Sequence, residues 1–165
     1  MKFLVFICLI IPITTIQSQE VESKSYQLML KTLLSHTVPE LSVSEVQEAQ
    51  TITWLDARAR GEYDISKIEN AQWVGYDDFN LDRVEELPKD AEIVVYCSVG
   101  YRSEKVAEQL QEAGFTNVSN LYGGIFEWKN QGRAVVDSTE SVTERVHAYS
   151  RTWGIWLKEG EKVYK

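Results

Sequence analysis

Residues 93–103 read IVVYCSVGYRS, and this stretch decides the fold class of the chain. The four apolar residues at its start predict a strand at the centre of a parallel sheet, where both faces are covered. A short loop, Cys97–Arg102, follows this strand. From Ser103 onward apolar residues recur at helical spacing, and Gly114 is placed to cap the helix that they predict. A strand, a short loop and a helix in this order indicate an α/β unit.

The segments on either side repeat this alternation. Ser42 and Glu45 have the spacing of a capping box, which predicts the start of a short helix. The pair Gly123–Gly124 leads into a short helical turn. Further strands are predicted over residues 52–55, 71–74 and 118–121, and further helices over residues 21–36, 42–49, 60–65 and 81–87. Strands and helices on short links predict an α/β domain with a largely parallel sheet.

Composition and charge exclude some classes of partner. The chain has 165 residues, 44% of them hydrophobic, and a net charge of −8. This length suits one domain of ordinary size with short extensions. The acidic balance, without a compensating basic run, disfavours nucleic acid or an anionic membrane as a partner, because phosphate binding requires clustered Lys and Arg.

Residues 1–18 have the layout of a secretory signal peptide, with a positive end, an apolar run over residues 3–13 and a polar exit. A membrane anchor is the alternative. It is disfavoured because the run contains Pro12 and is well short of the ~20 residues that a span requires. We therefore expect an exported protein, periplasmic or secreted, with no stable membrane span.

Cys97 is the candidate reactive residue. Removal of the leader, which contains Cys8, leaves it as the only cysteine, so no intramolecular disulfide can form. Ligands of open parallel sheets bind where strand ends meet helix starts, and backbone N–H groups there can surround an anion. Such a loop stabilises a thiolate and lowers its pKa from about 8.5 into the range ~3.5–7.5. The alternative is an inert, buried cysteine. The predicted anion-binding loop consists of Ser98, Val99, Gly100, Tyr101, Arg102 and Ser103.

Three motifs in the expected order make residues 52–136 resemble a rhodanese domain. Residues 55–58 (LDAR) with Glu62–Tyr63 are similar to the Asp-x-Arg…Glu-Tyr segment of that family. Residues 97–103 match its active-site pattern Cys-x-x-Gly-x-Arg-Ser. Residues 112–125 (EAGFTNVSNLYGGI) with Trp128 are similar to the end of its domain.

The resemblance implies both a fold and an activity. The implied fold is a three-layer α/β domain with a mostly parallel central sheet and helices on both faces. The implied activity is that of a sulfurtransferase without a cofactor. Cys97 would take a sulfane sulfur from thiosulfate or a persulfide, hold it as a persulfide, and pass it to a thiol, cyanide or a protein cysteine. Arg102 would order the loop or meet an anionic donor, while Asp56 and Arg58 would brace the loop and pair with Glu62.

Other function classes remain as alternatives. One is a non-catalytic rhodanese-like binding module in the cell envelope. Another is a phosphatase or arsenate reductase, which uses Cys-x5-Arg; here Arg102 follows Cys97 after four residues, and the smaller loop suits sulfur. A thioredoxin-like role lacks a Cys-x-x-Cys pair, and a metal site lacks a ligand cluster, because His36 and His147 are isolated in the sequence. Both histidines are expected to be ordinary surface or interface residues.

These interpretations divide the chain into four parts. Residues 1–18 are the signal peptide, residues 19–50 an N-terminal helical extension and lead-in, residues 51–137 the rhodanese-like domain and residues 138–165 an aromatic tail. The tail is expected to wrap the domain and cover apolar surface. The alternative is that its aromatic residues bind a partner, since exposed aromatic residues favour interfaces.

Overall fold

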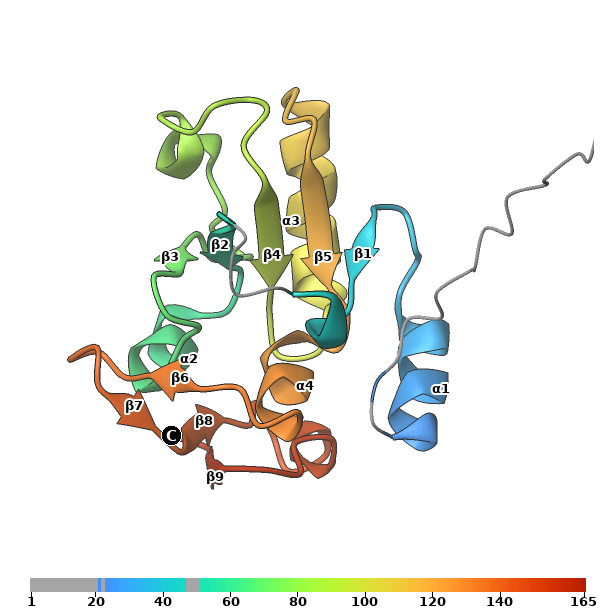
Figure 1. Cartoon of the computed structure of the whole chain (residues 1–165), viewed down its shortest axis with the longest axis vertical. Coiled ribbons are helices and arrows are strands. Elements are labelled where there is room, and N and C mark those ends of the chain that lie inside the picture. Colours follow the sequence, from blue (N-terminus) through green and yellow to red (C-terminus); the bar gives the residue numbers. More distant parts are fainter. Residues whose placement is uncertain (1–20, 22, 47–50) are drawn as a thin grey trace, which may run out of the picture.

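The computed structural model describes residues 21, 23–46 and 51–165, so the predicted signal peptide lies outside the described residues (Figure 1). Its centre is a five-stranded sheet with the order β1-β5-β4-β2-β3, in which every neighbouring pair is parallel. The strands are β1 (Glu40–Leu41), β2 (Thr53–Asp56), β3 (Gln72–Trp73), β4 (Ile93–Tyr96) and β5 (Val118–Leu121). Parallel neighbours require crossover connections, which is why helices and long loops lie between the strands.

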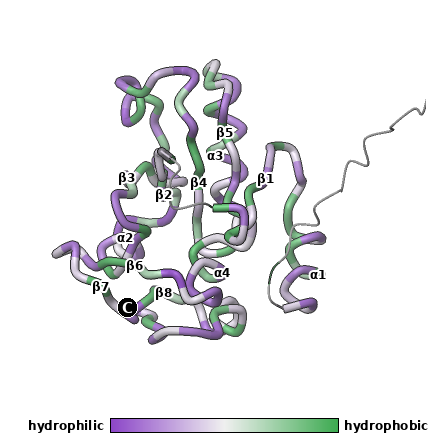
Figure 2. The backbone as a smooth tube through the Cα atoms, viewed as in Figure 1, coloured by the Kyte–Doolittle hydropathy of each residue, from purple (hydrophilic) through white to green (hydrophobic). Residues whose placement is uncertain are grey.

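Helices cover both faces of this sheet. Helix α3 (Tyr101–Glu112) packs against β4 and β5. Along β4, alternate side chains point to opposite faces. Ile93 and Val95 therefore join the apolar cluster under α3, whereas Val94 and Tyr96 join a second cluster formed with α1 (Lys24–Leu33), α4 (Gly124–Asn130) and the tail. The apolar centre is visible along β4 in Figure 2. The three-layer, mostly parallel α/β architecture is thus confirmed.

Most of the predicted elements are present, but α1 is shorter than the predicted 21–36, and two other predicted helices form only 3₁₀ turns. The segment 81–87 forms only the 3₁₀ helix Leu81–Val84. The capping box of Ser42 and Glu45 is present, yet it starts only the 3₁₀ helix Val43–Glu45, which Val46 caps. Residues 47–50 lie outside the described residues. Both segments are too short to repay helix nucleation by themselves.

The tail wraps the domain, as predicted. Its strand β7 (Val142–Thr143) pairs antiparallel with β6 (Val135–Val136), which directly precedes the tail, and β8 (Arg145–His147) is parallel to β9 (Glu161–Val163). Val146, Ala148 and Leu157 are fully buried. Trp156 stacks on Tyr26 of α1, with ring centroids 5.3 Å apart. The two segments outside the sheet core, α1 and the tail, therefore pack against each other.

Helix α2 (Arg60–Ile65) lies on the opposite side of the molecule from α1 and contacts β8 of the tail (Figure 1). Among the described residues, no helix is long and apolar enough to cross a bilayer.

Candidate active site

Cys97 lies at the carboxyl end of β4, directly after the last residue of the strand. A pocket of about 390 Å³ opens there and is lined by Cys97 together with Ser98, Val99, Tyr101 and Arg102. Because Cys97 is only 1% exposed, we place its sulfur at the base of this pocket. Of the predicted anion-binding loop, only Gly100 and Ser103 are missing from the lining.

The loop after Cys97 is shorter than predicted. Helix α3 begins at Tyr101 rather than Ser103, so Tyr101 and Arg102 belong to its first turn. Gly100 caps this helix in the left-handed conformation, with φ of 118°, which a residue with a side chain rarely adopts. Its N–H group donates a hydrogen bond to the Cys97 Sγ at 3.2 Å. The tight turn thus aims a backbone donor at the sulfur.

Polar contacts hold the back of the loop. The Asn120 amide donates to the Gly100 carbonyl at 3.0 Å, and the Ser103 hydroxyl lies 2.7 Å from Asn120 Oδ1. All three residues are buried, so these contacts satisfy polar groups that water cannot reach. They fix the position of Gly100 relative to the first turn of α3.

Helix α4 holds the front of the loop, and its close approach requires a glycine at its first residue. The N–H groups of Ile125 and Phe126 donate to the carbonyls of Cys97 and Ser98, at 2.9 and 3.2 Å. A Cβ atom on Gly124 would collide with the Cys97 carbonyl oxygen. Gly124 therefore allows the start of α4 to approach the backbone of the reactive residue.

Arg102 is bound to Glu62 of α2. Its guanidinium donates two hydrogen bonds to the Glu62 carboxylate, at 2.6 and 2.9 Å. The Ser98 hydroxyl lies 3.1 Å from the same carboxylate and 3.0 Å from Arg102 Nη2. Burial alone would raise the pKa of Glu62, but the hydrogen bonds and charge of Arg102 lower it, so this carboxylate is ionised at neutral pH. Glu62 thereby ties the loop to α2 through Ser98 and Arg102.

The same surroundings favour a Cys97 thiolate. Burial alone would raise the pKa of the Cys97 thiol. The positive charge of Arg102 and hydrogen bonding from Ser103 and Gly100 outweigh burial and lower this pKa below its ordinary value. The site therefore shifts the sulfur toward the form that acts as a nucleophile.

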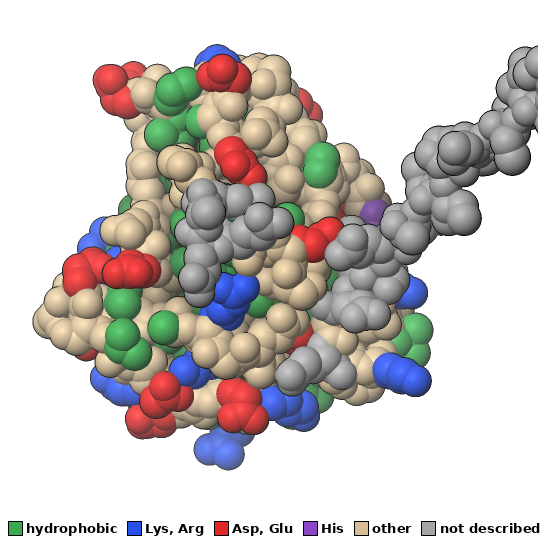
Figure 3. Space-filling model, viewed as in Figure 1, with side chains coloured by type: hydrophobic (Ala, Val, Ile, Leu, Met, Phe, Trp, Pro, Cys, Tyr) green, Lys and Arg blue, Asp and Glu red, His purple; other side chains and the backbone are tan. Residues whose placement is uncertain are grey.

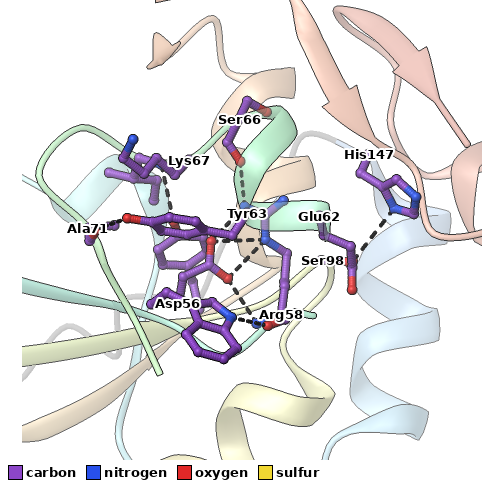
Figure 4. A network of polar contacts seen from close by, with 12 residues as sticks. Asp56, Arg58, Glu62, Tyr63, Ser66, Lys67, Ala71, Ser98 and His147 are labelled. Atoms are coloured by element: carbon purple, nitrogen blue, oxygen red, sulfur yellow. Dashed lines mark hydrogen bonds and ion pairs between the residues drawn. The ribbon is translucent and has the colours of Figure 1, made fainter. Parts of the chain in front are cut away.

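Asp56 and Arg58 form a separate, fully buried ion pair below α2 (Figure 4). Arg58 donates to both Asp56 carboxylate oxygens, with a shortest distance of 2.6 Å, and to the Ser66 carbonyl at 2.6 Å. The prediction that these residues pair with Glu62 is wrong. Arg58 folds back onto the carboxylate two residues earlier, which leaves Glu62 free to bind Arg102. Asp56 and Arg58 support the base of α2.

The sequence analysis did not include Glu62 in the site. Glu62 has a local signal, because it is the third residue of α2 and accepts from the Ala59 N–H at 3.0 Å, as in a capping box. His147 comes from β8, and its Nδ1 lies 3.8 Å from Glu62 (Figure 4). His147 is thus partly buried where β8 packs on α2, and it does not line the Cys97 pocket. No group of His, Cys, Asp and Glu among the described residues is arranged to hold a metal ion.

Comparisons with known proteins agree with this architecture. The family model of the rhodanese-like domain matches residues 42–131. A tRNA uridine(34) hydroxylase of Salmonella newport is 33% identical over 56% of this chain and 28% of that protein. A sulfurtransferase of Allochromatium vinosum is 41% identical over 33% of this chain and 50% of that protein. The chain thus matches between about a quarter and a half of the length of these relatives.

Among solved structures, a rhodanese-like domain from Anabaena sp. is 27% identical to this chain with a TM-score of 0.57. The match covers 62% of this chain and 82% of that domain. Helix α1 and the tail lie outside residues 42–131, the segment that the family model matches.

Proposed function

Because the chain belongs to the rhodanese-like domain family, we propose that it is a sulfurtransferase that carries sulfur as a persulfide on Cys97. The observation that carries this proposal is a single buried thiol at the base of a pocket, with its pKa lowered by Arg102 and by hydrogen bonds from the loop. A low-pKa thiol that a reagent can reach is the form in which cysteine acts as a nucleophile.

The proposed reaction has two steps. The Cys97 thiolate attacks the outer, sulfane sulfur of a donor such as thiosulfate or a persulfide. The sulfur–sulfur bond of the donor breaks, and sulfite or a thiolate leaves with the electron pair. A second nucleophile, such as a thiol, cyanide or a protein cysteine, then attacks the outer sulfur of the Cys97 persulfide and releases the thiolate. The Gly100 N–H stabilises the anion before and after transfer, because it lies 3.2 Å from Sγ.

Two other activities fit the site less well. The Arg102 guanidinium is held by two bonds to Glu62, which opposes its use as a binder of a phosphate or arsenate oxyanion. The hydroxylases named among the relatives act on tRNA, yet this chain matches only 28% of such a protein. On the face shown in Figure 3, basic side chains of the described residues are scattered among acidic ones rather than gathered into a patch, which does not favour nucleic acid.

Intact-mass spectrometry tests the proposal. The protein is incubated with thiosulfate or with inorganic polysulfide, and then with cyanide. We expect one sulfur atom to be added and then removed by cyanide. In Cys97→Ser no sulfur should be added. When the leader is retained, this variant still contains Cys8, which serves as an internal control for addition of sulfur to any thiol. If no donor changes the mass of the wild type, the chain is a non-catalytic binding module. Release of phosphate from an aryl phosphate would instead support the phosphatase.

The compartment is also part of the proposal. The leader over residues 1–18 supports a reaction in the cell envelope or outside the cell. Amino-terminal sequencing of the protein recovered from its native compartment tests this, because export predicts a mature chain that starts after the leader.

A further inference from the structure

The mouth of the Cys97 pocket is largely aromatic and apolar. Its apolar lining includes six large side chains, those of Leu33, Tyr76, Val99, Tyr101, Tyr149 and Trp153. Leu33 ends α1, and Tyr149 and Trp153 belong to the tail, so three of these residues lie outside the segment that matches the family model. Tyr101 and Tyr149 are 41% and 53% exposed. Exposed aromatic side chains grouped around an opening are typical of binding sites.

The backbone holds Tyr149 in place at an energetic cost. Its φ is 60°, a conformation that a bulky residue rarely adopts. The preceding residue, Ala148, is fully buried, and its N–H donates to the Val163 carbonyl at 2.8 Å. The Tyr149 ring lies 5.2 Å from the guanidinium carbon of Arg102. A strained backbone that projects a half-exposed ring over a reactive site points to a function for that ring.

The charges around the pocket disfavour small inorganic anions. The lining contains two carboxylates, Glu62 and Asp77, and one basic residue, Arg102. Glu62 already binds the Arg102 guanidinium with two hydrogen bonds. A doubly charged donor such as thiosulfate would therefore meet a site whose positive charge is already compensated, next to the Cys97 thiolate. The rest of the lining is mostly apolar.

On the premise of the proposed function, we propose that the substrate is a small organic thiol, or its persulfide, with an aromatic or aliphatic body and no anionic group near the sulfur. The body packs against Tyr149, Tyr101 and Leu33 while its sulfur reaches Cys97. The volume of about 390 Å³ suits a small molecule. As acceptor, the thiolate attacks the outer sulfur of the Cys97 persulfide. The bond to Sγ breaks, Cys97 leaves as a thiolate, and the organic persulfide is released. The donor reaction is the reverse.

A competition between two thiols tests this inference. Cys97 is first loaded with inorganic polysulfide, and the loss of the added sulfur is then followed by intact mass with phenylmethanethiol or with 2-mercaptoethanesulfonate. Rates are compared per unit of thiolate, so that only the body of the thiol differs. Burial of one aromatic ring should make phenylmethanethiol react about 10- to 100-fold faster.

Three variants identify the residues responsible. In Tyr149→Asn the ratio of the two rates should fall at least about threefold; Asn tolerates a positive φ, so the fold should be retained. Ile155→Ala is the matched control, because Ile155 is 50% exposed in the same tail and does not line the pocket, and the ratio should stay unchanged. In Asp77→Asn the sulfonate should react faster, since one opposing charge is removed.

The outcomes separate the two proposals. If neither inorganic polysulfide nor the persulfide of phenylmethanethiol adds sulfur to Cys97, the proposed function fails and this inference fails with it. If sulfur is added but both thiols discharge it at equal rates, the proposed function stands and the inference is overturned. It is also overturned if Tyr149→Asn retains the wild-type ratio.

Discussion

Replacing Arg102 with Met should slow the reaction of Cys97 with an alkylating reagent at neutral pH. Arg102 is the one basic residue among the described residues that line the pocket, and its charge lowers the pKa of the Cys97 thiol. An opposite charge within ~4–6 Å shifts an ionisation equilibrium by a factor of about 10 to 1000. Because Glu62 shares the Arg102 charge through two hydrogen bonds, we expect the lower end of this range, about a tenfold loss of thiolate.

The assay is the rate of alkylation of Cys97 by iodoacetamide as a function of pH, followed by intact mass. Only the thiolate reacts, so the rate falls as pH falls through the thiol pKa. In the wild type the midpoint should lie below about 8.5. In Arg102→Met the midpoint should move to higher pH, and the rate at neutral pH should fall about tenfold, which corresponds to about 1.4 kcal/mol.

Controls separate the charge from damage to the fold. Arg102→Met leaves the Glu62 carboxylate buried without its partner, which destabilises a protein. The double variant with Glu62→Gln removes both charges, and its midpoint should lie between those of the wild type and Arg102→Met. Arg102→Lys retains a positive charge and should remain close to the wild type. Arg60→Met is the matched control, because Arg60 is exposed on α2 and does not line the pocket. An unchanged pH profile in folded Arg102→Met would refute the electrostatic argument.

Two further predictions concern stability. Gly124→Ala should lower the free energy of unfolding, measured by urea denaturation, by about 1–3 kcal/mol, because Gly124 has a φ of 59° and a Cβ there collides with the Cys97 carbonyl. Gly61→Ala is the control, because a Cβ on Gly61 meets nothing within 4 Å, and its free energy of unfolding should be equal to that of the wild type or higher. Equal stability of the two variants would contradict the close approach of α4 to Cys97. Arg58→Met should lower the free energy of unfolding by about 3–5 kcal/mol, since Asp56 is left as an unpaired, fully buried charge. The double variant with Asp56→Asn should recover part of this loss. If Arg58→Met is as stable as the wild type, the ion pair contributes little to stability.

The fold could be predicted where the decisive pattern is local. Strand β4 and helix α2 have the predicted bounds, because an apolar run and a helical spacing are properties of neighbouring residues. The predicted start of α3, Ser103, is two residues too late, because the left-handed conformation of Gly100 allows the helix to begin at Tyr101. The segment 81–87 has helical spacing but forms only the 3₁₀ helix Leu81–Val84. Spacing alone does not show whether a short helix gains enough packing to form.

The site could be predicted only in part, for the same reason. The motif at residues 97–103 identified the reactive residue and its loop, because a loop is contiguous in sequence. The partner of Arg102 could not be identified from the sequence, because Glu62 is 40 residues away from it. The sequence does not show which of the two carboxylates, Asp56 or Glu62, pairs with Arg58 and which with Arg102. His147 is 3.8 Å from Glu62 only because β8 packs on α2. Ion pairs between distant segments depend on the tertiary arrangement rather than on spacing.

Reactivity and selectivity at Cys97 come from different parts of the chain. The groups that lower the thiol pKa belong to the loop and the first turn of α3, and Arg102 is held there by Glu62 of α2; all of them lie within residues 42–131. Tyr149 and Leu33 line the same pocket but come from segments outside those residues. A change in α1 or the tail can therefore alter which molecule reaches the sulfur while the thiolate is retained. A family motif can thus predict the chemistry of the thiol but not the molecule with which it reacts.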